Sequence, residues 1–114
     1  MKYKVYQIHL TDAEVDKINA EGHDSVPKHK LKLDMSFNDD PGHLAGVGLG
    51  MGYYDHVANI EADDLEGVFH IGNMGPEEKI ERLRDMHSLS VGDVVEDESG
   101  GRHVVAKFGF EKVD

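Results

Sequence analysis

The chain of 114 residues has no cysteine, no tryptophan and only three prolines. Without cysteine it forms neither disulfides nor thiolate metal sites, and it has no cysteine nucleophile. No apolar run approaches the roughly 18 residues that a membrane-spanning helix needs. The first residues, MKYKVYQIHL, lack a basic segment followed by an apolar stretch. We therefore expect no secretory signal and a cytoplasmic protein.

Basic residues are also scarce, since 12 Lys and Arg stand against 23 Asp and Glu and give a formal net charge of −11. Binding to phosphate backbones and to anionic membranes depends on cationic side chains. The charge therefore disfavours direct nucleic-acid binding and membrane attachment. It suits a basic protein partner or a surface that imitates DNA, and it also serves solubility alone.

The length allows one hydrophobic core, so residues 1–114 are predicted to form a single acidic domain. In the first third, residues 3–10 alternate and are rich in aromatic and β-branched side chains, which predicts a strand. Thr11 with Glu14 three positions later matches a capping box and predicts a helix that ends near Gly22. Residues 31–37 alternate again and predict a half-buried strand.

Glycines at positions 46, 48, 50 and 52 alternate with apolar residues. Glycine weakens a strand interior, so we predict that residues 38–53 form a glycine-rich loop, although an extended segment with all four glycines on one face is the alternative. The stretch lacks the Lys-Ser/Thr pair of a phosphate loop and does not match the dinucleotide pattern G-x-G-x-x-G. A nucleotide site is therefore not expected here.

In the second half, residues 54–62 predict a strand, and Asp63 predicts the cap of a helix that ends at Gly72. Pro76 is expected to begin a further helix. Residues 90–113 are expected to form a β-hairpin. This order indicates an α+β fold. It combines a small, mostly antiparallel sheet with two to three short helices and a C-terminal hairpin.

Eight histidines raise the alternative of a metal-binding protein or an enzyme. None of them forms an HExxH motif, and His23 and His29 lie in a predicted loop that sets no ligand geometry. Ser88 and Ser90 lie near His87, but neighbours in sequence often face apart, so they make no catalytic triad. We expect no catalytic residue, no metal site and no cofactor.

Two acidic tracts supply the candidate partner-binding residues, one between residues 55 and 66 and one between 93 and 98. If they share a face, they create a negative field suited to a basic partner, and nearby tyrosines supply aromatic anchors. A homodimer through Leu49, Met51 and Tyr53 is a further expectation if these are exposed. The candidate residues of the acidic surface are Tyr53, Tyr54, Asp55, Glu61, Asp63, Asp64, Glu66, Asp93, Glu96, Asp97 and Glu98.

Three short segments stand out near the end of the chain: His87–Val91, Asp93–Val95 and Phe108–Phe110. On them the C-terminal third resembles the YodL-like domains of mobile-element proteins. Most of the chain also resembles small proteins of tailed phages, especially those of cyanobacteria, on the segments YKVYQIHLTD, HVANIEADDLE and VFHIGNMGPEEKIERL. These resemblances imply a phage protein in an infected bacterium and carry no catalytic residues. YodL-like domains occur alongside antirestriction proteins, which implies a host-takeover setting.

The leading hypothesis is a non-catalytic phage accessory protein that binds a host protein, basic or DNA-binding, through its acidic surface. The alternative is a DNA mimic that blocks a DNA-binding or defence enzyme. The segment HSLSVGD is also a good connector between a helix and a strand, because polar residues bracket Leu89 and Gly92 permits a bend. Two interpretations of HSLSVGD therefore stay open: it is a structural connector, or it is part of a functional site.

Overall fold

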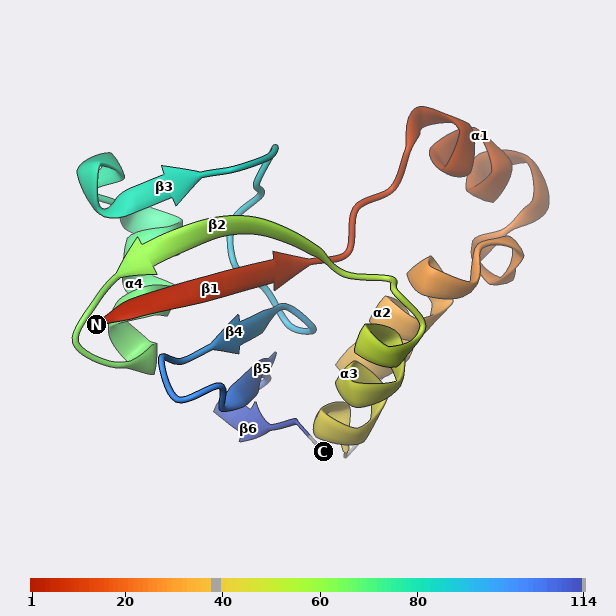
Figure 1. The fold of residues 1–114 in the computed structure, drawn as a ribbon. Coiled ribbons are helices and arrows are strands. Elements are labelled where there is room, and N and C mark those ends of the chain that lie inside the picture. The colour runs from red at the N-terminus through yellow and green to blue at the C-terminus, as the bar shows by residue number, and fades with distance from the viewer. Residues whose placement is uncertain (38–39, 114) are drawn as a thin grey trace.

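The computed structural model describes residues 1–37 and 40–113, which form a six-stranded sheet with helices on both faces (Figure 1). The strands are β1 (Lys2–Gln7), β2 (Asp55–Glu61), β3 (Ile80–Arg82), β4 (Val94–Glu96), β5 (Arg102–Ala106) and β6 (Gly109–Lys112). The helices are α1 (Asp12–Glu21), α2 (Pro27–Phe37), α3 (Pro41–Gly50) and α4 (Leu65–Met74), with short 3-10 helices η1 (His23–Ser25) and η2 (Glu77–Lys79).

The strand order is β3-β2-β1-β4-β5-β6, and each neighbouring pair is antiparallel. The predicted α+β class with an antiparallel sheet is thus confirmed. Within the described part of the chain, no helix has both the length and the apolar character needed to cross a membrane.

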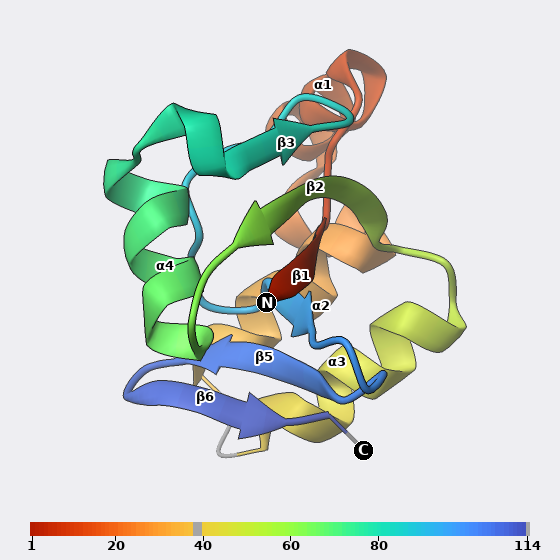
Figure 2. The same ribbon diagram turned by 60° about the vertical axis from the view of Figure 1, so that its left-hand side comes forward.

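The core is divided between the two faces of the sheet, as Figure 2 shows by placing α4 on one side and α2 and α3 on the other. Because side chains alternate along a strand, Tyr3 and Val5 pack with the α4 side. Tyr6 and Ile8 pack with the α2–α3 side, which includes Met35. The central strand β1 therefore contributes to both cores.

Local signals near the N-terminus are confirmed in detail. Thr11 Oγ1 accepts a hydrogen bond from the Glu14 amide at 3.1 Å, and Glu14 Oε1 accepts one from the Thr11 amide at 2.9 Å. Gly22 follows the last turn of α1 with a φ of 99°, a conformation that glycine adopts without strain.

The strand predicted at 54–62 is confirmed as β2, and the predicted hairpin is confirmed as β4–β5. A second turn at Lys107–Phe108 adds β6.

The strand predicted at residues 31–37 is wrong, because this stretch is the second half of α2. The apolar residues that alternate here also recur at a spacing of four, which suits one face of a helix. Leu31 and Met35 use that spacing to pack against the sheet. Phe37 falls off this face and is 82% exposed.

The glycine-rich loop predicted at residues 38–53 is also wrong over most of its length, because Pro41–Gly50 forms α3. Asp40 caps the helix by accepting a hydrogen bond from the His43 amide at 3.1 Å, and Pro41 occupies the first turn. Residues 38 and 39 of that prediction lie outside the described residues. Gly48 allows α2 and α3 to pack closely, since a Cβ at this position would lie 2.7 Å from Leu31 Cδ2.

The helix predicted to begin at Pro76 is absent from the described structure, in which η2 and the short strand β3 occupy that stretch. The edge of β2 is open to pairing there, and Ile80 pairs with Ile60. This long-range pairing outweighs the local helical preference. The preceding helix α4 begins one residue later than predicted, with Asp64 rather than Asp63 as its cap, and it ends at Gly75 rather than Gly72.

Candidate functional site

The structure brings five of the predicted acidic residues to one cleft of about 720 Å³. The cleft lies where the start of α4 meets the turn between β4 and β5, beside the beginning of β1. We call it the acidic cleft. Its carboxylates belong to Asp63, Asp64, Glu66, Asp97 and Glu98.

The strand order explains why residues about 30 positions apart meet in this cleft. Both neighbours of β1 run antiparallel to it, so both end near its first residues: Glu61 pairs with Lys2, and Glu96 pairs with Lys4. The chain that follows each strand therefore emerges beside Tyr3. The later residues of both acidic tracts, Asp63–Glu66 and Asp97–Glu98, lie there.

Tyr3 forms part of the cleft wall and is 3% exposed. Burial raises the pKa of the Tyr3 hydroxyl, and the charges of Asp64, Asp97, Glu98 and Asp63 raise it further. Four carboxylates from two tracts thus act on the same hydroxyl. The cleft is an electrostatically negative site, as expected if the two tracts share a face.

Two of these carboxylates also hold the local fold. Asp64 Oδ1 accepts a hydrogen bond from the Gly67 amide at 2.7 Å and so caps α4. Hydrogen bonds from the Ser99 hydroxyl, and then from His103 and the Gly101 amide, hold the pKa of Asp97 well below its usual range. Asp97 therefore stays ionised while it closes the β4–β5 turn.

The other three carboxylates, those of Asp63, Glu66 and Glu98, are exposed. Within the described chain they make no hydrogen bond or ion pair. They are therefore the carboxylates of the cleft whose charge no ion pair of the described chain offsets.

The remaining acidic candidates on the surface lie outside the cleft and have cationic neighbours. Glu61 pairs with the N-terminal ammonium at 3.0 Å, and Asp55 lies 3.9 Å from Arg84. Glu96 lies 2.9 Å from Arg102. The exposed pairs of Glu61 and Asp55 add little stability, but all three pairs reduce the free negative charge of these residues.

The two candidate tyrosines also lie away from the acidic cleft. Tyr54 donates its hydroxyl hydrogen to the Gly92 carbonyl, and burial followed by the charge of Asp93 raises the pKa of Tyr54 well above its usual range. Tyr53 packs against the core on the α2–α3 side. The aromatic residue of the cleft is Tyr3. The sequence pattern predicted only that Tyr3 lies in a strand, because its place in the cleft depends on the strand order.

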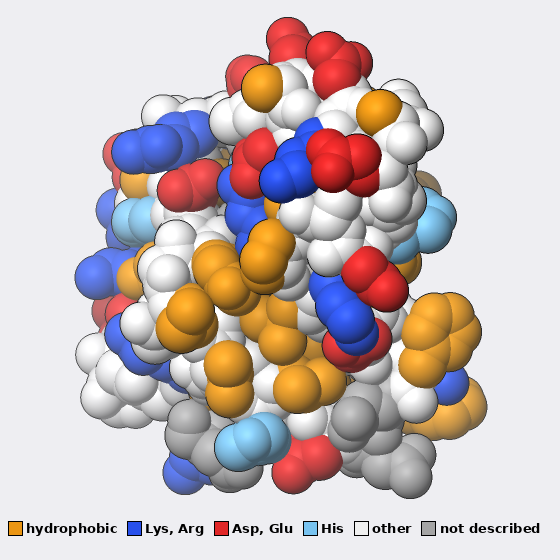
Figure 3. Space-filling view, turned by 90° about the vertical axis from the view of Figure 1, so that its right-hand side faces the viewer, with side chains coloured by type: hydrophobic (Ala, Val, Ile, Leu, Met, Phe, Trp, Pro, Cys, Tyr) orange, Lys and Arg blue, Asp and Glu red, His pale blue; other side chains and the backbone are white. Residues whose placement is uncertain are grey.

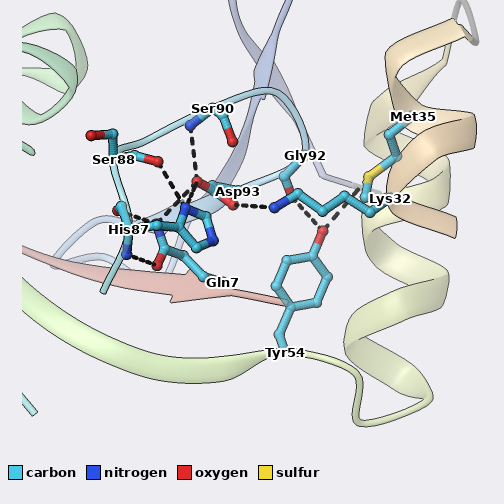
Figure 4. A network of polar contacts seen from close by, with 9 residues as sticks. All are labelled: Gln7, Lys32, Met35, Tyr54, His87, Ser88, Ser90, Gly92 and Asp93. Carbon is cyan, nitrogen blue, oxygen red and sulfur yellow. Dashed lines mark hydrogen bonds and ion pairs between the residues drawn. The ribbon is translucent and has the colours of Figure 1, made fainter. Parts of the chain in front are cut away.

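Asp93 lies inside the molecule rather than on the acidic surface, at the centre of a polar network (Figure 4). Its Oδ2 accepts hydrogen bonds from the Ser90 amide at 2.9 Å and from Gln7 Nε2 at 3.1 Å. Lys32 Nζ lies 4.0 Å from Oδ1, and His87 Nδ1 lies 4.0 Å from Oδ2. Asp93 therefore joins β1, α2 and the segment before β4.

Gln7 extends this network to the HSLSVGD segment. Its Nε2 donates to the His87 carbonyl at 2.8 Å, and its Oε1 accepts from the His87 amide at 3.2 Å. Leu89 in the same segment is buried in the α4-side core. The contacts of HSLSVGD are thus those of a structural connector.

The histidines supply no metal centre in the part of the chain that is described, since no three His, Asp or Glu side chains gather to hold an ion. His23 Nδ1 and His29 Nε2 lie 3.0 Å apart, but no third ligand accompanies this exposed pair. Catalytic geometry is likewise not visible at Ser88 or Ser90, which contribute a carbonyl and an amide to the network of Figure 4.

A cluster of phenylalanines adjoins the acidic cleft. Phe69 and Phe110 line a smaller hollow of about 350 Å³ together with Glu66, which also lines the acidic cleft. Phe108, in the turn between β5 and β6, is 97% exposed. We call these three residues the phenylalanine edge.

The helical side of the molecule carries a separate hydrophobic surface. Figure 3 shows hydrophobic side chains gathered over the lower half of this side, where α2 and α3 lie. The exposed members include Phe37, Val47 and Met51, whereas Leu49 and Tyr53 are partly buried. Of the three residues expected at a homodimer contact, Met51 is thus the one that is well exposed.

Comparisons of the chain with protein-family models, with curated proteins and with solved structures find no significant match.

Proposed function

We propose that the chain is a non-catalytic accessory protein that binds a basic protein partner through the acidic cleft. The observation that carries the proposal is the meeting of two separate acidic tracts around Tyr3. The resemblance to small tailed-phage proteins supports a host protein as the partner and the cytoplasm of an infected bacterium as the setting.

The cleft favours such a partner through its free charges. Asp63, Glu66 and Glu98 are exposed and make no ion pair in the described chain, although the Met1 ammonium lines the same cleft and Lys107 lines the hollow beside Glu66. A surface with one sign of charge attracts an oppositely charged protein over distances of about 8–10 Å at physiological salt and raises the association rate. Lysine or arginine side chains of the partner would pair with these three carboxylates.

The phenylalanine edge supplies apolar contact next to this charge. Glu66 lines both hollows, so the two surfaces are continuous. An aromatic side chain as exposed as Phe108 gains free energy when a partner covers it, and aromatic residues are enriched at protein interfaces. The expected partner therefore presents basic side chains beside an apolar pocket.

The first prediction concerns a variant that carries Asp63→Asn, Glu66→Gln and Glu98→Gln. The variant is expected to lose a partner that the wild-type protein captures from bacterial, preferably cyanobacterial, lysate, because the free charges of the cleft are removed. Quantitative mass spectrometry of the retained proteins at low and moderate salt measures the loss. Binding by the wild type should also weaken as salt increases.

The matched control carries Glu21→Gln, Glu78→Gln and Asp85→Asn, which remove three exposed carboxylates outside the cleft. It has the same net charge as the cleft variant and should retain the partner. Equal retention by both variants would contradict the proposal, as would no specific capture at either salt. A partner that duplex DNA displaces from the wild type would point instead to DNA mimicry.

A further inference from the structure

A second cavity, of about 550 Å³, lies at the opposite end of β1 from the acidic cleft. The connection between β1 and α1 covers it, and α2 and the segment 87–91 form its other walls. Its apolar wall includes Leu10, Leu33 and Val91, and its polar wall includes His9, Lys32 and His87. We call it the histidine pocket. Its volume lies in the range of about 300–1,000 Å³ that is usual for small-molecule sites.

The lining of the histidine pocket differs in composition from the chain as a whole, and the buried carboxylate of Asp93 lies 4.0 Å from its Lys32 and its His87. Its lining includes a lysine and three histidines, and the described residues that line it include no Asp or Glu. The chain has nearly twice as many acidic as basic residues, so this local composition is unusual. An anion is the ligand charge that such a lining favours.

Two imidazole nitrogens of the pocket residues have no partner. His9 Nε2 and His87 Nε2 are both buried, and neither makes a hydrogen bond to the described chain. The two rings lie 5.6 Å apart, centre to centre. His87 Nδ1 lies 2.8 Å from the Ser88 carbonyl and donates to it, which leaves Nε2 for another group. A buried polar atom without a partner costs free energy unless a ligand or water satisfies it.

Lys32 adds a fixed cation to this wall. Its ammonium lies 4.0 Å from the buried Oδ1 of Asp93, which Figure 4 shows beside it in the polar network. That distance is too long for a hydrogen bond. The ammonium therefore has donors left for a ligand, while Asp93 keeps the side chain near the pocket.

We propose that the histidine pocket binds a small organic anion with an apolar body, of the chemical class of a medium-chain carboxylate. The carboxylate accepts hydrogen bonds from the Lys32 ammonium and from imidazole Nε2 of His9 or His87. The apolar body lies along Leu10, Leu33 and Val91. When Nε2 carries a hydrogen, it donates to the carboxylate.

Octanoate is the probe for this proposal, and octylamine is its control, because the two share a chain length and differ in the charge of the head group. At about pH 6, where imidazoles commonly take up a proton, octanoate is expected to give saturable amide chemical-shift changes at Leu10, Leu33 and Val91. Octylamine should give none at these positions. The comparison uses the wild-type protein alone, so it does not depend on how any variant folds.

Lys32→Gln is expected to weaken octanoate binding by about ten-fold or more, because a charge-assisted hydrogen bond is lost. Lys30→Gln is the matched control, since Lys30 lies on the same helix, is exposed and pairs with Asp34 at 3.2 Å. Its affinity should equal that of the wild type. Amide spectra that superimpose away from the pocket verify the fold of both variants.

Three outcomes would overturn the proposal: equal binding of octylamine, an unchanged affinity of Lys32→Gln, or shift changes confined to the α2–α3 surface around Phe37, Val47 and Met51. The proposal is independent of the acidic cleft. Loss of partner capture in the cleft variant and loss of octanoate binding in Lys32→Gln are therefore separate results.

Discussion

Asp93→Ala is expected to lower the free energy of unfolding by about 2–4 kcal/mol, a large part of the roughly 5–15 kcal/mol that stabilises a domain. The substitution leaves the Ser90 amide without its acceptor and removes one acceptor from Gln7 Nε2. It also leaves Lys32 without a nearby anion and opens a small cavity in a site that is fully buried. Denaturant unfolding followed by circular dichroism measures the loss.

Asp93→Asn is the matched variant, since it keeps an oxygen that accepts from Ser90 and Gln7. It is expected to cost less than about half as much as the alanine variant. A loss for Asp93→Ala below about 1 kcal/mol, or equal losses for the two variants, would show that this network contributes little to stability.

The same carboxyl gives a pH dependence of stability with a defined sign. Burial raises the pKa of Asp93, and this effect outweighs the opposing effects of Lys32, Ser90, His87 and Gln7. The folded protein therefore binds this proton more tightly than the unfolded chain does. The stability that results is fully present below the usual carboxyl value of 3.8 and is lost as the pH rises through the higher pKa of the folded state.

Asp93→Asn should remove this contribution. In the pH range just above 3.8, the free energy of unfolding of the wild type should therefore fall relative to that of the variant as pH increases. Parallel pH profiles for the two proteins would show that Asp93 titrates alike in the folded and unfolded states.

Gly42→Ala is expected to lower the free energy of unfolding by about 1–3 kcal/mol. A Cβ at this position would overlap the backbone carbonyl oxygen of Lys112 in β6, so helix and strand must move apart. The end of α3 offers the control, because a Cβ on Gly50 meets no atom within 4 Å.

Gly50→Ala should therefore leave the stability unchanged or raise it by up to about 1 kcal/mol, since alanine favours helix over glycine. Denaturant unfolding of the two variants side by side measures the difference. A Gly42→Ala protein as stable as Gly50→Ala would indicate that α3 does not pack closely on β6.

These glycines also show which parts of the fold the sequence could predict. The capping box of Thr11 and Glu14 is a local signal, and it located the start of α1 correctly. The glycines of α3 have no such local explanation. A Cβ at Gly42 would overlap Lys112, and a Cβ at Gly48 would crowd Leu31 and Tyr54. Such contacts exist only in the folded chain. A pattern read along the sequence therefore indicated a loop.

The same distinction applies to β3 and to the candidate sites. Ile80 joins the sheet because the edge of β2 is open beside it, which no local preference reveals. The acidic tracts were visible in sequence, but their meeting at Tyr3 depends on β1 lying between β2 and β4. The histidine pocket combines three separate segments, and no spacing within any one of them indicates it.

The central position of β1 has a consequence for the order in which the protein can fold. Among the six strands this one comes first in the sequence, whereas its partners β2 and β4 begin at Asp55 and Val94. One edge therefore stays unpaired until β2 has been synthesised and the other until β4 has, and the sheet closes through contacts that are distant in sequence. Such long-range pairing slows folding and leaves apolar strand edges exposed to aggregation during synthesis. The acidic surplus of the nascent chain would counter that risk by mutual repulsion.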